Sequence, residues 1–305
     1  MRFPKVLVLI ALLSPAWAGV VEDVRGALAQ NSFPAAETEL NSYRAQNGVT
    51  PEYIEAYSWM ARAALVHGDY DQAAAYAKQT RALALEQLKQ RPLDAEPRLA
   101  TGLGAAIEVQ SQALAARGQR VQAVAVLQTA LRTYGSTSIR ARLQKNLNLL
   151  SFEGRPAPAL RAEQFLGSKP PVLTELKGSP VLLFFWAHWC SDCKAEVASL
   201  AEIQKAYGPR GLVLIAPTRL YGYGSNGRDA APSAEKKYIE TVRRQYYSQL
   251  GDVPVPLSAG NFLTYGASTT PTLVLIDAAG VVRLFHSGAL SGRELSLRMQ
   301  TVLKR

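Results

Sequence analysis

The sequence predicts a chain of two unlike parts, an α-helical repeat part followed by a mixed α/β part. Residues 20–150 are rich in Ala, Leu and Gln and show apolar residues at helical spacing, with few strand signals. After residue 151, short runs of β-branched and aromatic residues alternate with helical patterns. The length of 305 residues fits two domains, and 48% hydrophobic with 19% charged residues is typical of a globular protein.

The first 18 residues predict a signal peptide rather than a folded segment. Arg2 and Lys5 form a positively charged region before the apolar run Val6 to Leu13, and Ala16-Trp17-Ala18 has the small-x-small pattern of a cleavage site before Gly19. The run is too short to span a bilayer comfortably, and no Cys near the cleavage site offers a lipid attachment point. We therefore expect an exported, soluble mature protein, in a bacterial periplasm.

The helical part contains a repeated turn-and-helix pattern. Asn31, Gly68 and Gly118 each open a turn, and an Ala follows five residues later each time, at Ala36, Ala73 and Ala123. Small residues at such points let paired helices approach closely. The predicted helix pairs are Val20–Gln30 with Ala35–Gln46, Glu52–Val66 with Asp71–Gln90, and Glu96–Arg117 with Val121–Tyr134, followed by a capping helix at Ser138–Leu150.

This pattern resembles the tetratricopeptide repeat in the turn and second helix of each unit. The units are spaced by 37 and 50 residues rather than by a fixed period of about 34. The alternative is a plain α-helical bundle. The resemblance implies a concave face that binds a protein partner, and the sequence does not identify that partner.

Two cysteines lie where a buried strand meets a helix. Val181–Phe185 is a continuous apolar run, typical of a central strand, and the apolar stripe of Lys194–Tyr207 predicts a helix. Cys190 then precedes the first helical turn and Cys193 lies one turn further on. Backbone N–H groups and the helix dipole favour a thiolate at a helix N-terminus. The placement predicts Cys190 as a partly exposed nucleophile and Cys193 as the resolving thiol.

The composition favours redox chemistry for this pair. A zinc site needs two further N or S ligands, yet the chain has no third Cys and three His in all. An exported chain with two cysteines in one C-x-x-C is not using disulfides as structural cross-links. We expect no metal and no cofactor.

The remaining elements of the second part follow in order. Phe152–Leu160 carries Pro and Gly and marks a boundary between domains 19–150 and 151–305. A short strand and turn are expected at 170–178, a strand at 211–216, an exposed loop at 217–232 and a helix at 233–250. These are followed by an extended piece at 253–257, a helical turn at 261–265, a hairpin of strands 269–277 and 281–285, and a closing helix at 295–303.

This order and its motifs resemble the exported TlpA/ResA-type thiol–disulfide oxidoreductases. The motifs are Phe185-Trp-Ala187, Trp189-Cys190 with Cys193, Glu196, Thr270-Pro271-Thr272 and Leu275-Ile-Asp277. The resemblance implies a thioredoxin-like three-layer α/β/α domain, with a cis Thr270–Pro271 bond facing the cysteines. It also implies that Thr270 and Pro271 shape a substrate groove and that Trp189 lies on its rim.

The resemblance implies protein disulfides as substrates and a thiol–disulfide partner as electron donor. Two departures concern the proton relay. Phe184 stands where thioredoxin has a buried Asp, and Pro217–Leu220 offers no acid after the second strand. The remaining candidates for adjusting the thiol pKa values are His188, Asp192 and Glu196, of which Glu196 is nearest to Cys193 by sequence.

Three alternatives remain for the function. The cysteines and a His could bind Cu(I), since thiolates suit that metal, although copper chaperones of this fold usually space their cysteines more widely. The chain could be a protein-binding scaffold with secondary redox activity. The third alternative is a thiol peroxidase, which is disfavoured because such enzymes normally have Thr three residues before the Cys, where this chain has Ala187.

The net charge of +10 is spread over the sequence rather than clustered. This distribution favours solvated helix faces over nucleic-acid binding.

Overall fold

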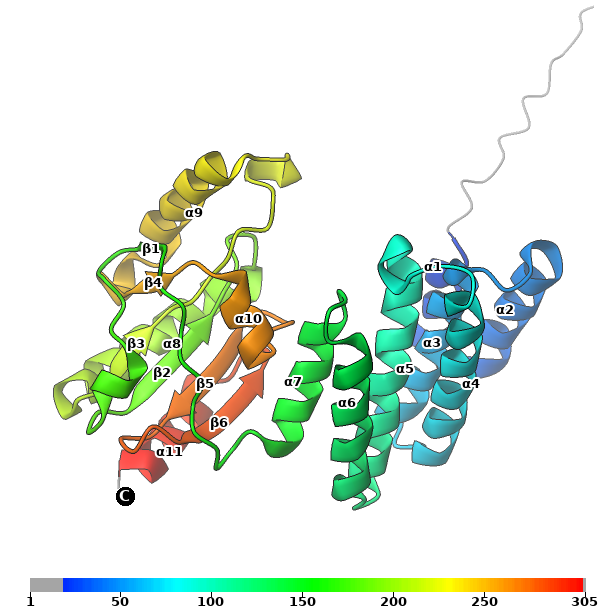
Figure 1. Ribbon diagram of the computed structural model, residues 1–305, viewed down its shortest axis with the longest axis horizontal. Coiled ribbons are helices and arrows are strands. Elements are labelled where there is room, and N and C mark those ends of the chain that lie inside the picture. The colour runs from blue at the N-terminus through cyan, green and yellow to red at the C-terminus, as the bar shows by residue number, and fades with distance from the viewer. Residues whose placement is uncertain (1–18, 304–305) are drawn as a thin grey trace, which may run out of the picture. The chain divides into compact units, whose positions relative to one another are not determined.

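The computed structural model describes residues 19–303 (Figure 1). The predicted signal peptide lies outside these residues. The chain divides into two compact units, and the division falls between Ala106 and Ile107 within one helix. The predicted boundary near residue 150 marks a different change, from helices alone to a mixed fold, and as a domain boundary it stays a prediction.

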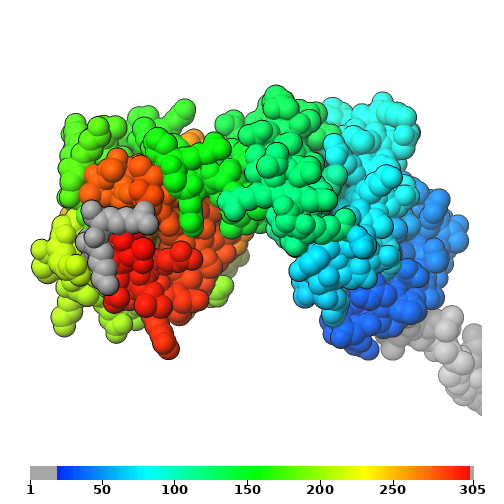
Figure 2. All heavy atoms as spheres, turned by 90° about the horizontal axis from the view of Figure 1, so that it is seen from below, coloured from blue at the N-terminus to red at the C-terminus, as the bar shows by residue number. Residues whose placement is uncertain are grey.

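The first unit consists of helices joined by short turns. They are α1 (Val20–Ala29), α2 (Phe33–Asn47), α3 (Pro51–Val66), α4 (Tyr70–Leu88), a 3₁₀ turn η1 (Leu93–Ala95) and the first half of α5 (Pro97–Ala116). Helix α1 packs on α2 and α3, and α3 packs on α4. In the space-filling view α1 to α4, blue to cyan, form one closely packed body (Figure 2).

Local sequence explains where these helices begin and how closely they pair. The side chains of Ser32, Thr50 and Asp69 each accept a hydrogen bond from a backbone N–H in the first turn of the following helix. Ala36 and Ala73 are completely buried, as expected of small residues between paired helices. The helical architecture predicted for this part is confirmed, whereas its assignment as a tetratricopeptide repeat stays a prediction.

The second unit starts with the rest of α5, followed by α6 (Arg120–Tyr134) and α7 (Arg140–Ser151). Glu108 on α5 binds Arg142 and Lys145 on α7, each at 2.7 Å. Each helix predicted between residues 20 and 150 is present, with its ends shifted by no more than two residues.

A four-stranded sheet forms the centre of the second unit, in the order β3-β2-β5-β6. Strand β2 (Val181–Phe185) runs parallel to β3 (Val213–Ile215) and antiparallel to β5 (Thr272–Ile276), which forms a hairpin with β6 (Val282–Ser287). Every residue of β2 and β5 is buried. Such continuous apolar runs are typical of strands covered on both faces.

Helices cover both faces of this sheet. One face packs against α8 (Ser191–Tyr207), α9 (Pro232–Tyr246) and α11 (Gly292–Leu303), through residues such as Leu200, Ile239 and Met299. The other face packs against α10 (Ala259–Tyr265) through Phe262 and Tyr265. The predicted three-layer α/β/α arrangement is therefore confirmed.

Helix α7 belongs to this fold as well. The amide of buried Asn148 donates a hydrogen bond to the Tyr265 carbonyl at 2.6 Å. Gly266, with φ of 65°, ends α10 directly against the α7 backbone, where a Cβ atom would collide with Lys145. Just after α7, the Phe152 ring packs edge-on against Tyr265 and Phe285. The helix is thus part of the cover over the sheet.

One strand prediction is wrong. Residues 170–178 form no strand but contain a 3₁₀ turn, η2 (Leu173–Leu176), because Leu173 and Leu176 eclipse at this spacing and both pack on the sheet. A strand that the sequence did not signal, β1 (Phe165–Leu166), pairs with β4 (Val255–Pro256) in a separate small sheet.

The shorter elements are η3 (Gly208–Arg210), η4 (Ser225–Gly227) and η5 (Ser248–Leu250). Among the helices of residues 19–303, none combines the length and apolar character needed to cross a membrane.

Candidate active site

Cys190 and Cys193 form a disulfide at the start of α8, with Cα atoms 5.3 Å apart. Cys190 is the N-cap residue, and its sulfur accepts the backbone N–H of Cys193 at 3.1 Å. The helix start predicted from the sequence is therefore observed. The exposure differs from the expectation, since Cys190 is only 4% exposed, while Cys193 is fully buried.

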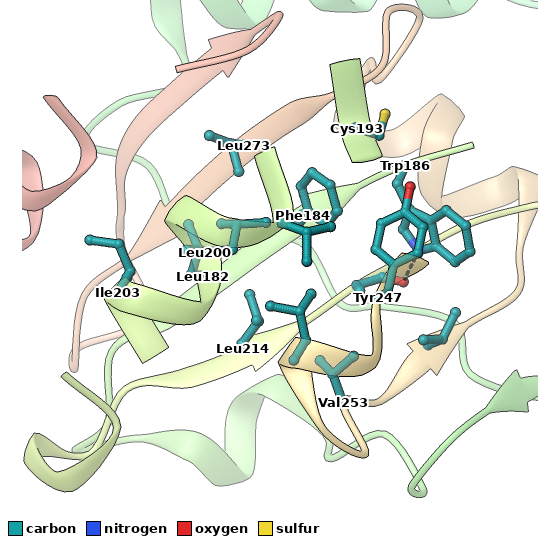
Figure 3. Packing of buried hydrophobic residues seen from close by; sticks show 14 of the residues in the cluster. Leu182, Phe184, Trp186, Cys193, Leu200, Ile203, Leu214, Tyr247, Val253 and Leu273 are labelled. Carbon is teal, nitrogen blue, oxygen red and sulfur yellow. Dashed lines mark hydrogen bonds between the residues drawn. The ribbon is translucent and has the colours of Figure 1, made fainter. Parts of the chain in front are cut away.

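The segment between β2 and α8 is held by hydrogen bonds to the chain directly after β3. Trp186 donates its backbone N–H to Pro217 and its ring N–H to Ala216, the latter at 2.9 Å, and its carbonyl accepts the Thr218 hydroxyl at 2.8 Å. Figure 3 shows the Trp186 ring beside Tyr247, with centroids 4.4 Å apart. The strand that ends at Phe185 thereby delivers the cysteines to a fixed position at the edge of the core.

Thr270 lies against the disulfide and is followed by Pro271. The bond between them is cis, as the resemblance implies. The Cys190 sulfur is 3.5 Å from the Thr270 carbonyl oxygen. The Thr270 hydroxyl is buried and has no hydrogen-bond partner within the described part of the chain. Since Trp189 is 50% exposed next to Cys190, we define Trp189, Cys190, Thr270 and Pro271 as the active-site rim.

Glu196 is buried on α8, one turn after Cys193. One carboxylate oxygen accepts the Leu290 backbone N–H at 3.0 Å, and the other has no hydrogen-bond partner among residues 19–303. Burial raises the pKa of Glu196 to about 7, the Leu290 contact opposes this shift, and Asp192 adds to it. Asp192 itself is exposed in the first turn of α8. Glu196 can therefore change protonation state near neutral pH.

Where thioredoxin has its buried acid, this structure has aromatic rings. Figure 3 shows Phe184 below Cys193, with Trp186 and Tyr247 alongside. Phe184 and Tyr247 lie with ring centroids 6.3 Å apart. Burial raises the pKa of Tyr247, so its hydroxyl stays protonated at ordinary pH. With no acid in this region, Glu196 is the buried carboxyl that lies nearest in sequence to Cys193 among the described residues.

His188 is buried among tyrosine rings rather than exposed to solvent. Its ring contacts Tyr221, Tyr223 and Tyr238 edge-on, with centroids 5.3 to 5.5 Å away. The Nε2 atom is 3.4 Å from a carboxylate oxygen of Glu235, without hydrogen-bond geometry. Burial lowers the pKa of His188, although Glu235 opposes the shift. A protonated His188 that favours the Cys190 thiolate is therefore disfavoured near neutral pH.

Sequence reasoning missed Glu235, which is completely buried. Its carboxylate accepts the backbone N–H groups of Tyr221 and Gly222, at 2.5 and 2.9 Å. A Glu in the first turn of a helix usually faces solvent, so the sequence carries no signal for this burial. Glu235 thereby fixes the first part of the predicted loop 217–232, whereas residues 225–229 are exposed as the sequence predicts.

Tyr221 and Arg219 were missed as well. The Tyr221 ring meets Trp189 edge-on at 5.6 Å and Phe262 at 6.4 Å. The Arg219 guanidinium lies 4.6 Å from the centre of the Tyr221 ring and 5.5 Å from that of Phe262. Their positions depend on tertiary contacts across about 30 residues or more, which periodicity does not encode.

The arrangement suits thiol chemistry more than metal binding. Within residues 19–303, no group of three or more His, Cys, Asp or Glu side chains is placed to hold a metal ion. The copper-binding alternative therefore gains no support. The Cys190 sulfur receives a backbone N–H, and the buried carboxyl of Glu196 can take up a proton. A dithiol with these two features can carry out disulfide exchange.

Comparisons with known proteins point to the same chemistry. The AhpC/TSA family model matches residues 154–218. The thioredoxin-like protein YneN of Bacillus subtilis is 27% identical over 150 residues, which cover 48% of this chain and 78% of YneN. The thiol:disulfide interchange protein DsbE of Xylella fastidiosa is 29% identical over 130 residues, or 43% of this chain and 58% of DsbE.

The thiol-disulfide oxidoreductase ResA of Bacillus anthracis is 29% identical over 131 residues, which cover 42% of this chain and 66% of ResA. Among solved structures, the exposed lipoprotein thioredoxin Etrx1 of Streptococcus pneumoniae is 27% identical, with a TM-score of 0.36 over 48% of this chain and all of Etrx1. A thioredoxin family protein of Chlorobium tepidum is 23% identical, with a TM-score of 0.34, and the match covers 50% of this chain and 99% of that protein. The chain thus spans 58% to 78% of the three curated relatives.

Proposed function

Since the second unit carries a thioredoxin-like domain similar to ResA and DsbE thiol–disulfide oxidoreductases, we propose that the protein exchanges disulfides with protein substrates through Cys190 and Cys193. The observation that carries this proposal is the Cys190 sulfur at the α8 N-cap, which receives the Cys193 N–H and lies beside the Thr270 carbonyl.

The reaction proceeds in two exchange steps. The Cys190 thiolate attacks a substrate disulfide, and the other substrate sulfur leaves as a thiolate that takes up a proton. Cys193 then loses its proton, attacks the Cys190 sulfur, and releases the first substrate sulfur as a thiol. The substrate gains two electrons and two protons, and the enzyme keeps the Cys190–Cys193 disulfide. A dithiol partner protein is the electron donor that reduces it again.

Glu196 is the proton acceptor for Cys193 in this scheme. Its buried carboxyl follows Cys193 by one helical turn, where side chains three residues apart are neighbours. Its free oxygen and its pKa of about 7 fit a group that takes a proton near neutral pH. Exposed Asp192 acts only through its charge, and buried His188 positions the segment before Cys190.

The active-site rim receives the substrate chain. Trp189 offers half-exposed aromatic surface next to Cys190. Thr270 offers a carbonyl beside the sulfur. Together with Pro271, these groups can hold an extended substrate segment across the disulfide.

The helical part brings a partner protein. In the first unit, α1 and α3 line a hollow of about 320 Å³ with Leu28, Trp59 and Val66, and Val66 is 83% exposed. The guanidinium groups of Arg25 and Arg62 lie 4.6 and 4.4 Å from the centre of the Trp59 ring. The Trp59 ring between these two guanidinium groups is a suitable contact for another protein, since Trp and Arg are enriched where proteins bind one another. We also propose export to the periplasm, from the pattern of residues 1–18.

Trapping tests the proposal. In a Cys193→Ser variant of the full chain, Cys190 still attacks, but no second thiol releases the mixed disulfide. We expect a high-mass complex that reductant dissolves, and Cys190→Ser should abolish disulfide reduction with little change in stability. The variant with both Cys190→Ser and Cys193→Ser is the control. If Cys193→Ser traps nothing beyond the double variant, protein disulfides are not the substrates and the scaffold alternative gains support.

A further inference from the structure

Arg219 is a cation without an anionic partner beside the active-site rim. Within residues 19–303, no carboxylate lies within ion-pair distance of its guanidinium, and its buried Nε atom has no hydrogen-bond partner. Other arginines of the same unit are paired, such as Arg142 with Glu108 and Arg283 with Asp277. A half-buried guanidinium without a carboxylate is costly unless a ligand or solvent completes it.

Aromatic rings fix the plane of this guanidinium. It lies over Tyr221 and Phe262, at 4.6 and 5.5 Å from the ring centres. The Phe262 ring packs edge-on against buried Phe185 at 5.2 Å, which anchors that side in the core. Stacking on aromatic faces leaves the N–H edge of an arginine available for a planar anion. A carboxylate is the anion that fits such an edge in two hydrogen bonds.

Arg219 is connected to the reacting Cys190 through the rings of Tyr221 and Trp189. Tyr221 lies under Arg219 and meets Trp189 edge-on at 5.6 Å, and Trp189 precedes Cys190. The nearby acid Glu235 is not available to Arg219, because its oxygens accept the backbone N–H groups of Tyr221 and Gly222. The cation is therefore held next to the place where a substrate segment would lie.

We propose that Arg219 binds a carboxylate of the substrate, so that the protein prefers disulfides whose cysteine is flanked by Asp or Glu. The inference rests on the proposed disulfide exchange and adds the substrate class to it. Arg219 acts here as a specificity residue that contacts the substrate, not as a group that reacts.

Three peptides test the preference with the full-length, reduced protein. Each carries one Cys as a mixed disulfide with 2-mercaptoethanol, flanked by Glu, Gln or Lys. The expected order of reduction rates is Glu, then Gln, then Lys. Arg219→Ala should slow the Glu peptide about fivefold and change the Gln peptide less than about twofold, as expected of a partly exposed ion pair. Added salt should reduce the advantage of the Glu peptide.

Variants of the same segment sharpen the test. Arg219→Glu should reverse the order, so that the Lys peptide reacts faster than the Glu peptide. Arg228→Ala removes an exposed arginine of the same loop and should leave all three rates unchanged. The iodoacetamide reactivity of Cys190 across pH should match the wild type in Arg219→Ala.

Two results would overturn the inference while leaving disulfide exchange intact. One is equal wild-type rates for the three peptides. The other is an Arg219→Ala variant slowed equally on all three, with a shifted Cys190 pKa, which would assign Arg219 to the thiolate instead. A wild-type protein that reduces none of the peptides would contradict the proposed function itself, and this inference with it.

Discussion

At the scale of single residues, the active site depends on which polar groups are buried. Cys193 and Glu196 lie one helical turn apart and are both buried, whereas Asp192, directly before Cys193, is exposed. A carboxylate that leaves water without a cation partner loses hydration, and this favours its protonated form. The charge state of Glu196 is therefore coupled to the folding of the domain.

Glu196→Gln should change how stability depends on pH. The folded-state pKa of about 7 is above the ordinary value, so the folded protein holds this proton more tightly than the unfolded chain. The wild type should thus lose stability as pH rises from about 4.5 towards 7, by an amount on the order of 2–3 kcal/mol at most. The Gln variant keeps an oxygen for Leu290 and should lack this loss.

Urea unfolding of both oxidised proteins at pH 5 and pH 8 measures the effect. The variant should gain stability relative to the wild type at pH 8 but not at pH 5. An equal difference at both pH values would show that Glu196 keeps an ordinary pKa in the folded state.

At the scale of elements, one carboxylate joins α9 to the chain after β3. Glu235 is fully buried and accepts two backbone N–H groups from Tyr221 and Gly222. Removing it leaves these donors unpaired in the interior, which costs more than the loss of an exposed contact. The segment that carries Arg219 and Tyr221 therefore depends on Glu235 for its position.

Glu235→Ala should destabilise the protein by about 2–4 kcal/mol. Glu240→Ala on the same helix is a matched control. It removes ion pairs with exposed Arg244 and with partly buried Arg243, and should cost about 1 kcal/mol, less than Glu235→Ala. Denaturant unfolding measures both, and amide exchange at Tyr221 and Gly222 should accelerate only in Glu235→Ala. Equal costs for the two variants would contradict the role of Glu235.

Two glycines test the contact between α7 and α10. Gly266 and Gly211 both end a helical turn in the left-handed region, with φ of 65° and 91° and ψ of 31° and 6°, so Ala brings a similar backbone cost of about 1–2 kcal/mol at either position. Only at Gly266 does the added Cβ collide with the backbone of α7, whereas at Gly211 it makes an ordinary contact with Ser179 at 3.8 Å. Gly266→Ala should therefore cost about 1–3 kcal/mol more than Gly211→Ala. Thermal unfolding of both variants would detect the difference, and equal losses would refute the close contact.

At the scale of the whole molecule, the change of fold and the division into units fall at different points. Helix α7 precedes the mixed sheet in sequence, yet Asn148 binds the Tyr265 carbonyl within the second unit. A fragment of residues 136–305 should fold cooperatively, because it keeps α7 over α10. A fragment of residues 152–305 should be less stable and should bind more of a hydrophobic dye. Circular dichroism melts and dye fluorescence would compare them, and equal stability would contradict the structural role of α7.

The sequence predicts the parts of this molecule that are governed by local rules. Helices with turn residues and apolar stripes, the C-x-x-C at a strand–helix junction and the Thr-Pro before β5 are short-range patterns. The partners of Glu235 and Arg219 are not, because their surroundings are assembled from α9, α10 and the chain after β3. The short strand at Phe165–Leu166 was missed for the same reason, since its pairing with Val255–Pro256 links residues far apart in sequence.

The packing of α7 sets where this protein can be recombined with others. The Pro- and Gly-containing stretch after Phe152 is the fusion point that the sequence suggests for a chimera. A fusion there would remove α7, which packs against Tyr265 and Gly266. A join in the turn before Arg140 would move α7 together with the sheet. Redox modules transplanted from this chain should accordingly be defined by what covers their core, and should carry one helix more than their fold name implies.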